Sequence, residues 1–126
     1  MTRILIIDDD ESILSFLKER LMGEGFKVLT ASDGKEGMSL FNGNQVDLVI
    51  TDIIMPDKDG FETIIELKRI CPDIKIIAMS GGGRGHPEHY LDTARCFRAQ
   101  YTLEKPFKTS DLLEAVYALL NEEKTS

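Results

Sequence analysis

The sequence is poor in cysteine, in positive charge and in long apolar runs, and each shortage argues against a class of protein. Only two cysteines occur in 126 residues, Cys71 and Cys96, and they lie far apart and in no metal-binding spacing. A chain of this length buries a sizeable core without disulfides, so we expect free thiols in a reducing cytoplasm. The apolar run near the N-terminus is short and ends in four acids, so we expect neither a signal peptide nor a membrane span.

The charge balance argues against nucleic acid as a direct partner. Fifteen Lys and Arg residues stand against 22 Asp and Glu residues, which gives a net charge of -7. Phosphate backbones are bound mainly through Lys and Arg side chains, which are in deficit here. An acidic chain instead permits a cluster of carboxylates with a bound cation. The hydrophobic content of 42% is that of an ordinary globular domain.

Short apolar runs alternate along the chain with helical patterns. The runs are rich in β-branched residues and predict buried strands over 3–7, 26–31, 46–51, 74–79 and 101–104. Apolar residues at helical spacing predict helices over 11–22, 34–41, 60–70, roughly 87–97, and 111–121. Asp10 is the expected cap of the first helix, and Thr109 or Ser110 that of the last. The alternation predicts one α/β domain, residues 1–121, with a parallel sheet, helices on both faces and a frayed tail over 122–126.

Polar side chains follow four of the predicted strands where each strand ends. Asp8 and Asp9 follow the first strand, Asp52 the third, Ser80 the fourth and Lys105 the fifth. In an open parallel sheet the functional crevice lies beyond these ends. Clustered carboxylates repel one another unless their pKa values rise or a cation neutralises them, and oxygen ligands favour Mg²⁺. Such a set suits phosphoryl transfer to a carboxylate nucleophile.

Two features near these strand ends have simpler interpretations. Asp10 and Asp33 are better explained as helix caps than as site residues. The stretch "MSGGGRG" (79–85) is not a phosphate-binding P-loop, because no lysine follows Gly85. Its useful group is the Ser80 hydroxyl. The glycines that follow, Gly81, Gly82 and Gly83, lack side chains, and we expect them to form a mobile edge of the site.

The segments "ILIIDDDE", "DLVITDIIMPDKDG", "IIAMS" and "LEKPF" together resemble the receiver domains of two-component response regulators. The resemblance covers the whole chain, strand by strand. It implies a doubly wound, flavodoxin-like (βα)5 three-layer sandwich whose five parallel strands run in the order 2-1-3-4-5. It further implies a phosphoacceptor that takes part in its own phosphorylation and dephosphorylation, rather than a conventional enzyme.

The resemblance also implies roles for individual residues. Asp52 would be the phosphoacceptor, and it would ligate Mg²⁺ directly together with Asp9 and the backbone carbonyl of Ile54. Asp8 would act mainly through a metal-bound water.

Further roles fall on the last two strands. Lys105 would pair with the phosphoryl group, and Ser80 would be the hydroxyl that moves to hydrogen-bond it. The peptide bond between Lys105 and Pro106 would be cis, a rare state in folded chains.

The implied partner is a sensor histidine kinase or a histidine phosphotransfer protein. Phosphorylation would switch the surface formed by the fourth helix, fifth strand and fifth helix, which binds a downstream protein that the sequence does not specify. We expect a cytoplasmic monomer or weak homodimer with no membrane partner. One departure bears on this output: Thr102 stands where the family usually has a switch aromatic. Tyr101 is adjacent, but neighbouring strand residues point to opposite faces. We therefore predict that the partner surface does not depend on the rotamer of an aromatic side chain.

Two alternatives remain open. The Asp8-x-Asp10 pattern also resembles the nucleophile motif of haloacid-dehalogenase-type phosphatases, with Asp8 as the nucleophile. Those enzymes need a later acid after the fourth strand, where "SGGGRG" has none. The second alternative is a receiver-like domain that is never phosphorylated, against which the complete set of acids, Ser80 and Lys105 argues.

Overall fold

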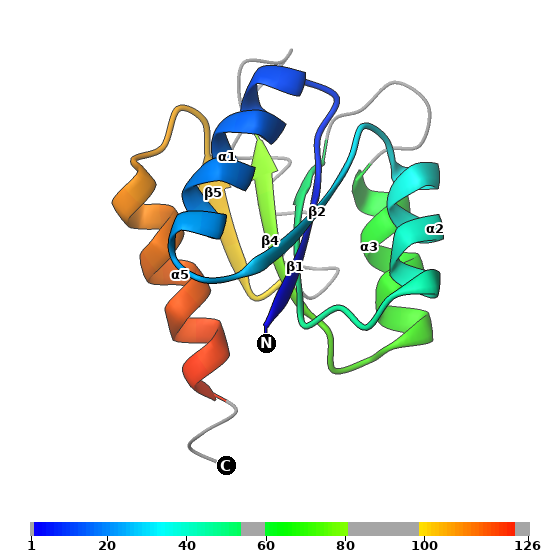
Figure 1. Ribbon diagram of the computed structural model, residues 1–126. Coiled ribbons are helices and arrows are strands. Elements are labelled where there is room, and N and C mark those ends of the chain that lie inside the picture. The colour runs from blue at the N-terminus through cyan, green and yellow to red at the C-terminus, as the bar shows by residue number, and fades with distance from the viewer. Residues whose placement is uncertain (1, 54–59, 81–98, 123–126) are drawn as a thin grey trace.

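The computed structural model describes residues 2–53, 60–80 and 99–122, and strands and helices alternate as predicted as far as residue 80 (Figure 1). The elements are β1 (Arg3–Ile7), α1 (Glu11–Gly23), β2 (Lys27–Ala31), α2 (Gly34–Gly43), β3 (Leu48–Asp52), α3 (Gly60–Ile70), β4 (Lys75–Ser80), β5 (Tyr101–Glu104) and α5 (Thr109–Glu122). The helix predicted over roughly 87–97 lies outside the described residues. No helix in the described part of the chain is long and apolar enough to cross a membrane.

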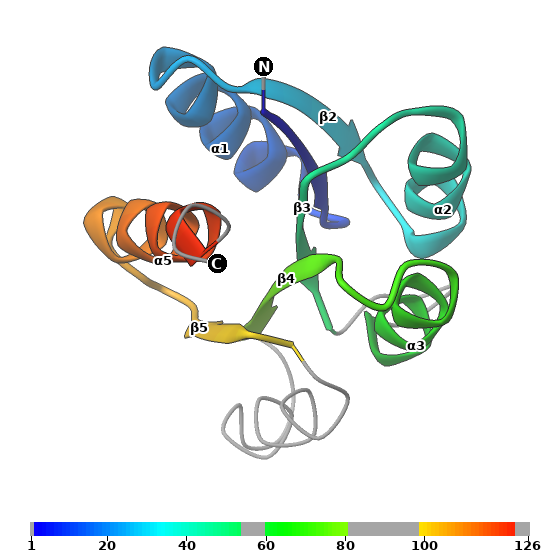
Figure 2. The same cartoon turned by 90° about the horizontal axis from the view of Figure 1, so that it is seen from below.

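The five strands form one parallel sheet in the order β2-β1-β3-β4-β5, which confirms the predicted topology. Figure 2 shows α1 and α5 on one face of the sheet and α2 and α3 on the other, so the sheet is the middle of three layers. Helices on both faces are the consequence of crossover connections between parallel strands. This arrangement directs the carboxyl ends of all five strands to the same edge.

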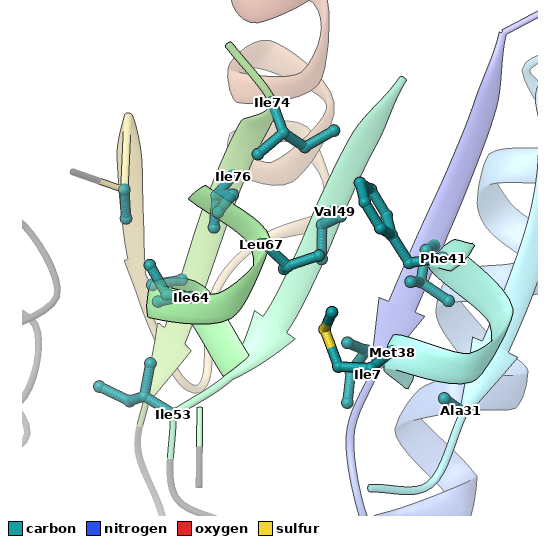
Figure 3. Close-up of a cluster of buried hydrophobic side chains, with 13 residues drawn as sticks. Ile7, Ala31, Met38, Phe41, Val49, Ile53, Ile64, Leu67, Ile74 and Ile76 are labelled. Carbon is teal, nitrogen blue, oxygen red and sulfur yellow. The ribbon is translucent and has the colours of Figure 1, made fainter. Parts of the chain in front are cut away.

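The three inner strands are apolar because both of their faces are covered. β1, β3 and β4 are buried over almost their whole length, whereas β2 and β5 at the sheet edges keep exposed residues. Side chains alternate between two core clusters, one on each face. The cluster under α2 and α3 (Figure 3) includes Ile7, Met38, Phe41, Val49, Ile64, Leu67 and Ile76. The cluster under α1 and α5 includes Ile6, Leu17, Leu21, Ile50, Ile77, Leu112 and Val116.

The termini of α1 follow from local sequence chemistry. Asp10 caps the helix as predicted, because its side chain accepts hydrogen bonds from the backbone N–H groups of Ser12 and Ile13. At the other end, the N–H of Phe26 bonds to the carbonyl of Leu21, and Gly25 adopts a φ of 96°. That left-handed conformation favours glycine and ends the helix in a Schellman motif.

The structure corrects several predicted boundaries. The cap expected at Thr109 or Ser110 is wrong: α5 already begins at Thr109, because the Lys108 carbonyl accepts the N–H groups of Asp111 and Leu112. β3 runs from Leu48 to Asp52 rather than over 46–51. β4 likewise extends to Ser80. Asp52 and Ser80 are therefore the last residues of their strands, held by the sheet itself.

Candidate functional site

The predicted site residues that the structure describes meet at the carboxyl edge of the sheet. Asp8 directly follows the end of β1, and Lys105 directly follows the end of β5. Asp52 ends β3 and pairs in register with Met79, the residue before Ser80. Ser80 in turn pairs with Glu104, the residue before Lys105. The parallel register therefore gathers residues far apart in the sequence at one place, as predicted.

Lys105 links the two buried acids of this edge. Its Nζ lies 2.7 Å from Oδ2 of Asp8 and 3.1 Å from Oδ2 of Asp52. The Asp8 side chain is fully buried, and Asp52 is only 7% exposed. A cation in this position offsets the cost of keeping two carboxylates out of water next to each other.

Asp8 is held from three directions. One carboxylate oxygen, Oδ1, accepts the backbone N–H of Asp10 at 2.9 Å, and the other, Oδ2, accepts the Lys105 ammonium. Its own N–H donates to the carbonyl of Ala31, the last residue of β2, at 3.0 Å. The sequence indicated that Asp10 caps α1, but not that its N–H contacts Asp8. An acid two residues before a helix cap is the pattern of an Asx turn, and it could have revealed this contact.

Burial and pairing shift the pKa values of Asp8 and Lys105. Burial raises the pKa of Asp8 above its usual range, although the hydrogen bonds from Lys105 and from the Asp10 N–H act in the opposite direction. For Lys105, burial alone lowers the pKa, but the hydrogen bond to Asp8 and the charge of Asp52 outweigh it and raise the pKa. The lysine is thus firmly protonated, while Asp8 still bears a cost for its charge. A further cation at this edge would lower that cost.

Three carboxylates could hold such a cation. Among the described residues, Asp8, Asp9 and Asp52 each offer an oxygen, and these atoms all lie within 4.8 Å of one another. Asp9 is exposed, so the group opens to solvent on one side. An all-oxygen set with access to water fits Mg²⁺, which keeps several of its waters when bound to proteins. Ile54, whose carbonyl the resemblance assigns as a ligand, lies outside the described residues, as do Gly81, Gly82 and Gly83.

Ser80 carries a buried hydroxyl that the site does not satisfy. Its side chain is fully buried, and its Oγ has no hydrogen-bond partner among the described residues. An orphaned buried hydroxyl costs free energy unless a partner arrives. The Ser80 carbonyl, in contrast, accepts the N–H of Lys105. The Lys105–Pro106 peptide bond is cis, as the resemblance implied.

Comparisons with known proteins identify the family. The sequence model of the response regulator receiver domain family matches residues 4–117, which is most of the chain. The chain is a response regulator receiver domain. Among curated receiver-domain proteins, the response regulator SaeR of Staphylococcus aureus is 33% identical over 124 residues, and these cover 98% of this chain but 53% of SaeR. The chain thus spans about half the length of the curated relatives it matches.

Solved receiver domains have the same fold over nearly the whole chain. A receiver domain protein from Clostridium thermocellum has a TM-score of 0.89 and 35% identity, with 99% of this chain and 98% of that chain covered. The response regulator TrrA of Thermotoga maritima has a TM-score of 0.83 and 35% identity, with 94% and 99% covered. The TrrA structure is of a complex with Mg²⁺ and BeF.

Proposed function

We propose that this receiver domain accepts a phosphoryl group on Asp52 from the phosphohistidine of a sensor histidine kinase or a histidine phosphotransfer protein. The observation that carries the proposal is the position of Lys105 Nζ, within 3.1 Å of the Asp52 carboxylate and 2.7 Å of Asp8. An ammonium group there faces the charge that develops on transferred phosphoryl oxygens. The family assignment supports the same chemistry.

Asp52 is better suited than Asp8 to be the nucleophile. Both oxygens of the fully buried Asp8 carboxylate accept hydrogen bonds, from Asp10 and Lys105. Asp52 keeps some exposure at the end of β3. This argues, with the family, against the phosphatase alternative in which Asp8 attacks a phosphate ester.

In the proposed exchange, the P–N bond of the donor's phosphohistidine breaks as a P–O bond forms to a carboxylate oxygen of Asp52. The released imidazole nitrogen takes up a proton from solvent. Asp8, Asp9 and Asp52 would hold Mg²⁺ together with the Ile54 carbonyl, and bound Mg²⁺ neutralises charge on the transferred oxygens. Lys105 orients the acceptor carboxylate and stays protonated, since its pKa is raised.

The output follows from the unsatisfied hydroxyl of Ser80. A phosphoryl group on Asp52 brings acceptor oxygens to the end of β3, beside the end of β4, and the Ser80 Oγ gains a partner there. The new hydrogen bond of Ser80 shifts the equilibrium between two arrangements of the carboxyl ends of β4 and β5. We propose that the downstream partner, a protein, binds the surface formed by the helix predicted over roughly 87–97, β5 and α5. We expect the domain to be a cytoplasmic monomer or weak homodimer.

The register of β5 supports a readout that does not use a switch aromatic. Tyr101 pairs with Ile77 and Thr102 pairs with Ala78, so the two side chains lie on opposite faces of the sheet. Ile77 and Ala78 belong to different core clusters, one on each face. Tyr101 therefore does not replace the aromatic that the family usually has at the position of Thr102.

The test is phosphorylation by acetyl phosphate in the presence of Mg²⁺, followed by mass spectrometry of the intact chain. Asp52→Asn is expected to abolish the added phosphoryl group, since the amide is no nucleophile. Asp33→Asn is the matched control, because Asn keeps the helix cap that Asp33 provides to α2. Undiminished labelling of Asp52→Asn would overturn the assignment. Turnover of a phosphate ester that survives in Asp52→Asn but not in Asp8→Asn would favour the phosphatase.

A further inference from the structure

We propose that Asp10 is a positioning residue of the acidic site: by capping α1, it fixes the backbone N–H group that holds Asp8. The inference deepens the proposed function, because it concerns how Asp8 is prepared for Mg²⁺. Asp10 itself lies outside the three carboxylates whose oxygens converge.

The contacts of Asp10 connect the start of α1 to the site. Its Oδ1 accepts the N–H of Ser12 at 2.9 Å and that of Ile13 at 3.4 Å. Its carbonyl accepts the N–H of Leu14 at 3.1 Å, the first backbone bond of the helix. These bonds hold Asp10 in an extended conformation with φ -91° and ψ 106°. In that conformation its own N–H donates to Oδ1 of Asp8 at 2.9 Å.

Asp8 is thereby restrained at both carboxylate oxygens by different parts of the fold. The start of α1 holds Oδ1, and Lys105 at the end of β5 holds Oδ2. With one restraint removed, the carboxylate is free to rotate about its bond to Cβ and follow the lysine alone. Groups that orient a metal ligand from outside are commonly worth about 10- to 100-fold in metal affinity. The cap of α1 is such a group, acting through one backbone N–H.

A different role for Asp10 has to be separated from this one. Its exposed carboxylate adds a negative charge near the cluster and would attract a cation directly. Asn and Ser are good helix caps that lack this charge, and alanine lacks both the cap and the charge. Comparing Asp10→Asn and Asp10→Ser with Asp10→Ala therefore distinguishes positioning from simple attraction.

The experiment titrates the full chain with Mg²⁺, without any phosphodonor, and follows backbone amide shifts by NMR. Asp10→Ala is expected to weaken Mg²⁺ binding by about tenfold. Asp10→Asn and Asp10→Ser are expected to stay within about twofold of the wild type, since both keep the cap. Asp33→Ala is the matched control. Oδ1 of Asp33 caps α2 by accepting the Glu36 N–H at 2.8 Å. Removing this cap should leave Mg²⁺ affinity unchanged.

Hydrogen exchange of the residue 10 amide gives a second readout that needs no metal. Exchange should accelerate in Asp10→Ala and stay slow in Asp10→Asn. Equal losses of affinity in the alanine, asparagine and serine variants would overturn the proposal in favour of charge. Unchanged Mg²⁺ affinity in Asp10→Ala would also overturn it, since that variant lacks both the cap and the charge. If the wild type binds no Mg²⁺, the proposed function fails, but exchange at residue 10 still decides whether the cap orders this amide.

Discussion

Replacing Lys105 with methionine is expected to destabilise the domain strongly at neutral pH. Methionine keeps the apolar stem of the side chain but removes the ammonium group that bridges Asp8 and Asp52. Both carboxylates would then remain buried next to each other without this ammonium group. Removing one member of a buried ion pair costs more than the pair is worth, because the charge that remains is uncompensated.

The magnitude follows from the burial of the three groups. Breaking a fully buried pair typically costs about 3–5 kcal/mol. The Lys105 side chain is 15% exposed, so water reaches part of the site, and we expect a loss of about 2–3 kcal/mol in the free energy of unfolding. A domain of this size loses about 1–3 kcal/mol of stability per molar urea, so the urea midpoint should fall by about 1 M.

The assay is urea unfolding followed by circular dichroism, with Lys108→Met as the matched control. Lys108 is exposed in the same connection to α5 and takes part through its backbone carbonyl, which the substitution keeps. Its loss should therefore change the midpoint little. Equal midpoints for the two variants at neutral pH would refute the view that Lys105 compensates the acids.

The same variants give a pH dependence with a definite sign. The pKa of Asp8 is raised above 3.8 in the folded state, so ionising it costs stability as pH rises through that raised value. The stabilisation from Lys105, whose pKa is raised above 10.5, is present below 10.5 and is lost as pH rises through the folded value. The difference between the wild type and Lys105→Met should therefore shrink as pH falls towards 3.8. A constant difference down to that pH would contradict the electrostatic explanation.

Two further substitutions test how α2 packs on β1 and how β5 is held against β4. Gly37→Ala should destabilise the fold by about 1–2 kcal/mol in urea unfolding, because a Cβ there would lie 2.4 Å from Cδ1 of the fully buried Ile7. Gly43→Ala in the same helix is the control, because a Cβ there has nothing within 4 Å and alanine favours a helix more than glycine does. An equal loss in Gly43→Ala would show that the contact with Ile7 is not the cause. Gln100→Leu should cost about 1–2 kcal/mol and speed hydrogen exchange of the Ile76 N–H, which the Gln100 side chain accepts at 2.8 Å. Unchanged exchange would show that this bond does not hold β5 against β4.

The sheet could be predicted from the sequence because its signal is local and repeated. Buried parallel strands need uninterrupted apolar runs, and β1 and β4 are such runs in the printed sequence. Once the strand ends are known, parallel topology places Asp8, Asp52 and Lys105 at one edge without further information.

The remaining features depend on contacts that no local pattern specifies. The orphaned Ser80 hydroxyl is visible only when every neighbouring group is placed. The hydrogen bonds of the Gln100 side chain, just before β5, also have no sequence signature. They join it to backbone groups of Ile74 and Ile76, about 25 residues away in the sequence. The sequence predicts a later start for α5 because Thr109 and Ser110 are good caps, whereas in the structure the Lys108 carbonyl accepts the first helical bonds.

The position of Lys105 also has a consequence for how the chain folds. Lys105 lies 97 residues from Asp8 and 53 residues from Asp52 along the sequence. During synthesis, both acids emerge well before the lysine that compensates them. A partly folded form in which β5 has not docked must keep these carboxylates in water or bury them without a cation. Either course disfavours compact intermediates that lack β5, so the acidic edge makes folding of this domain more cooperative.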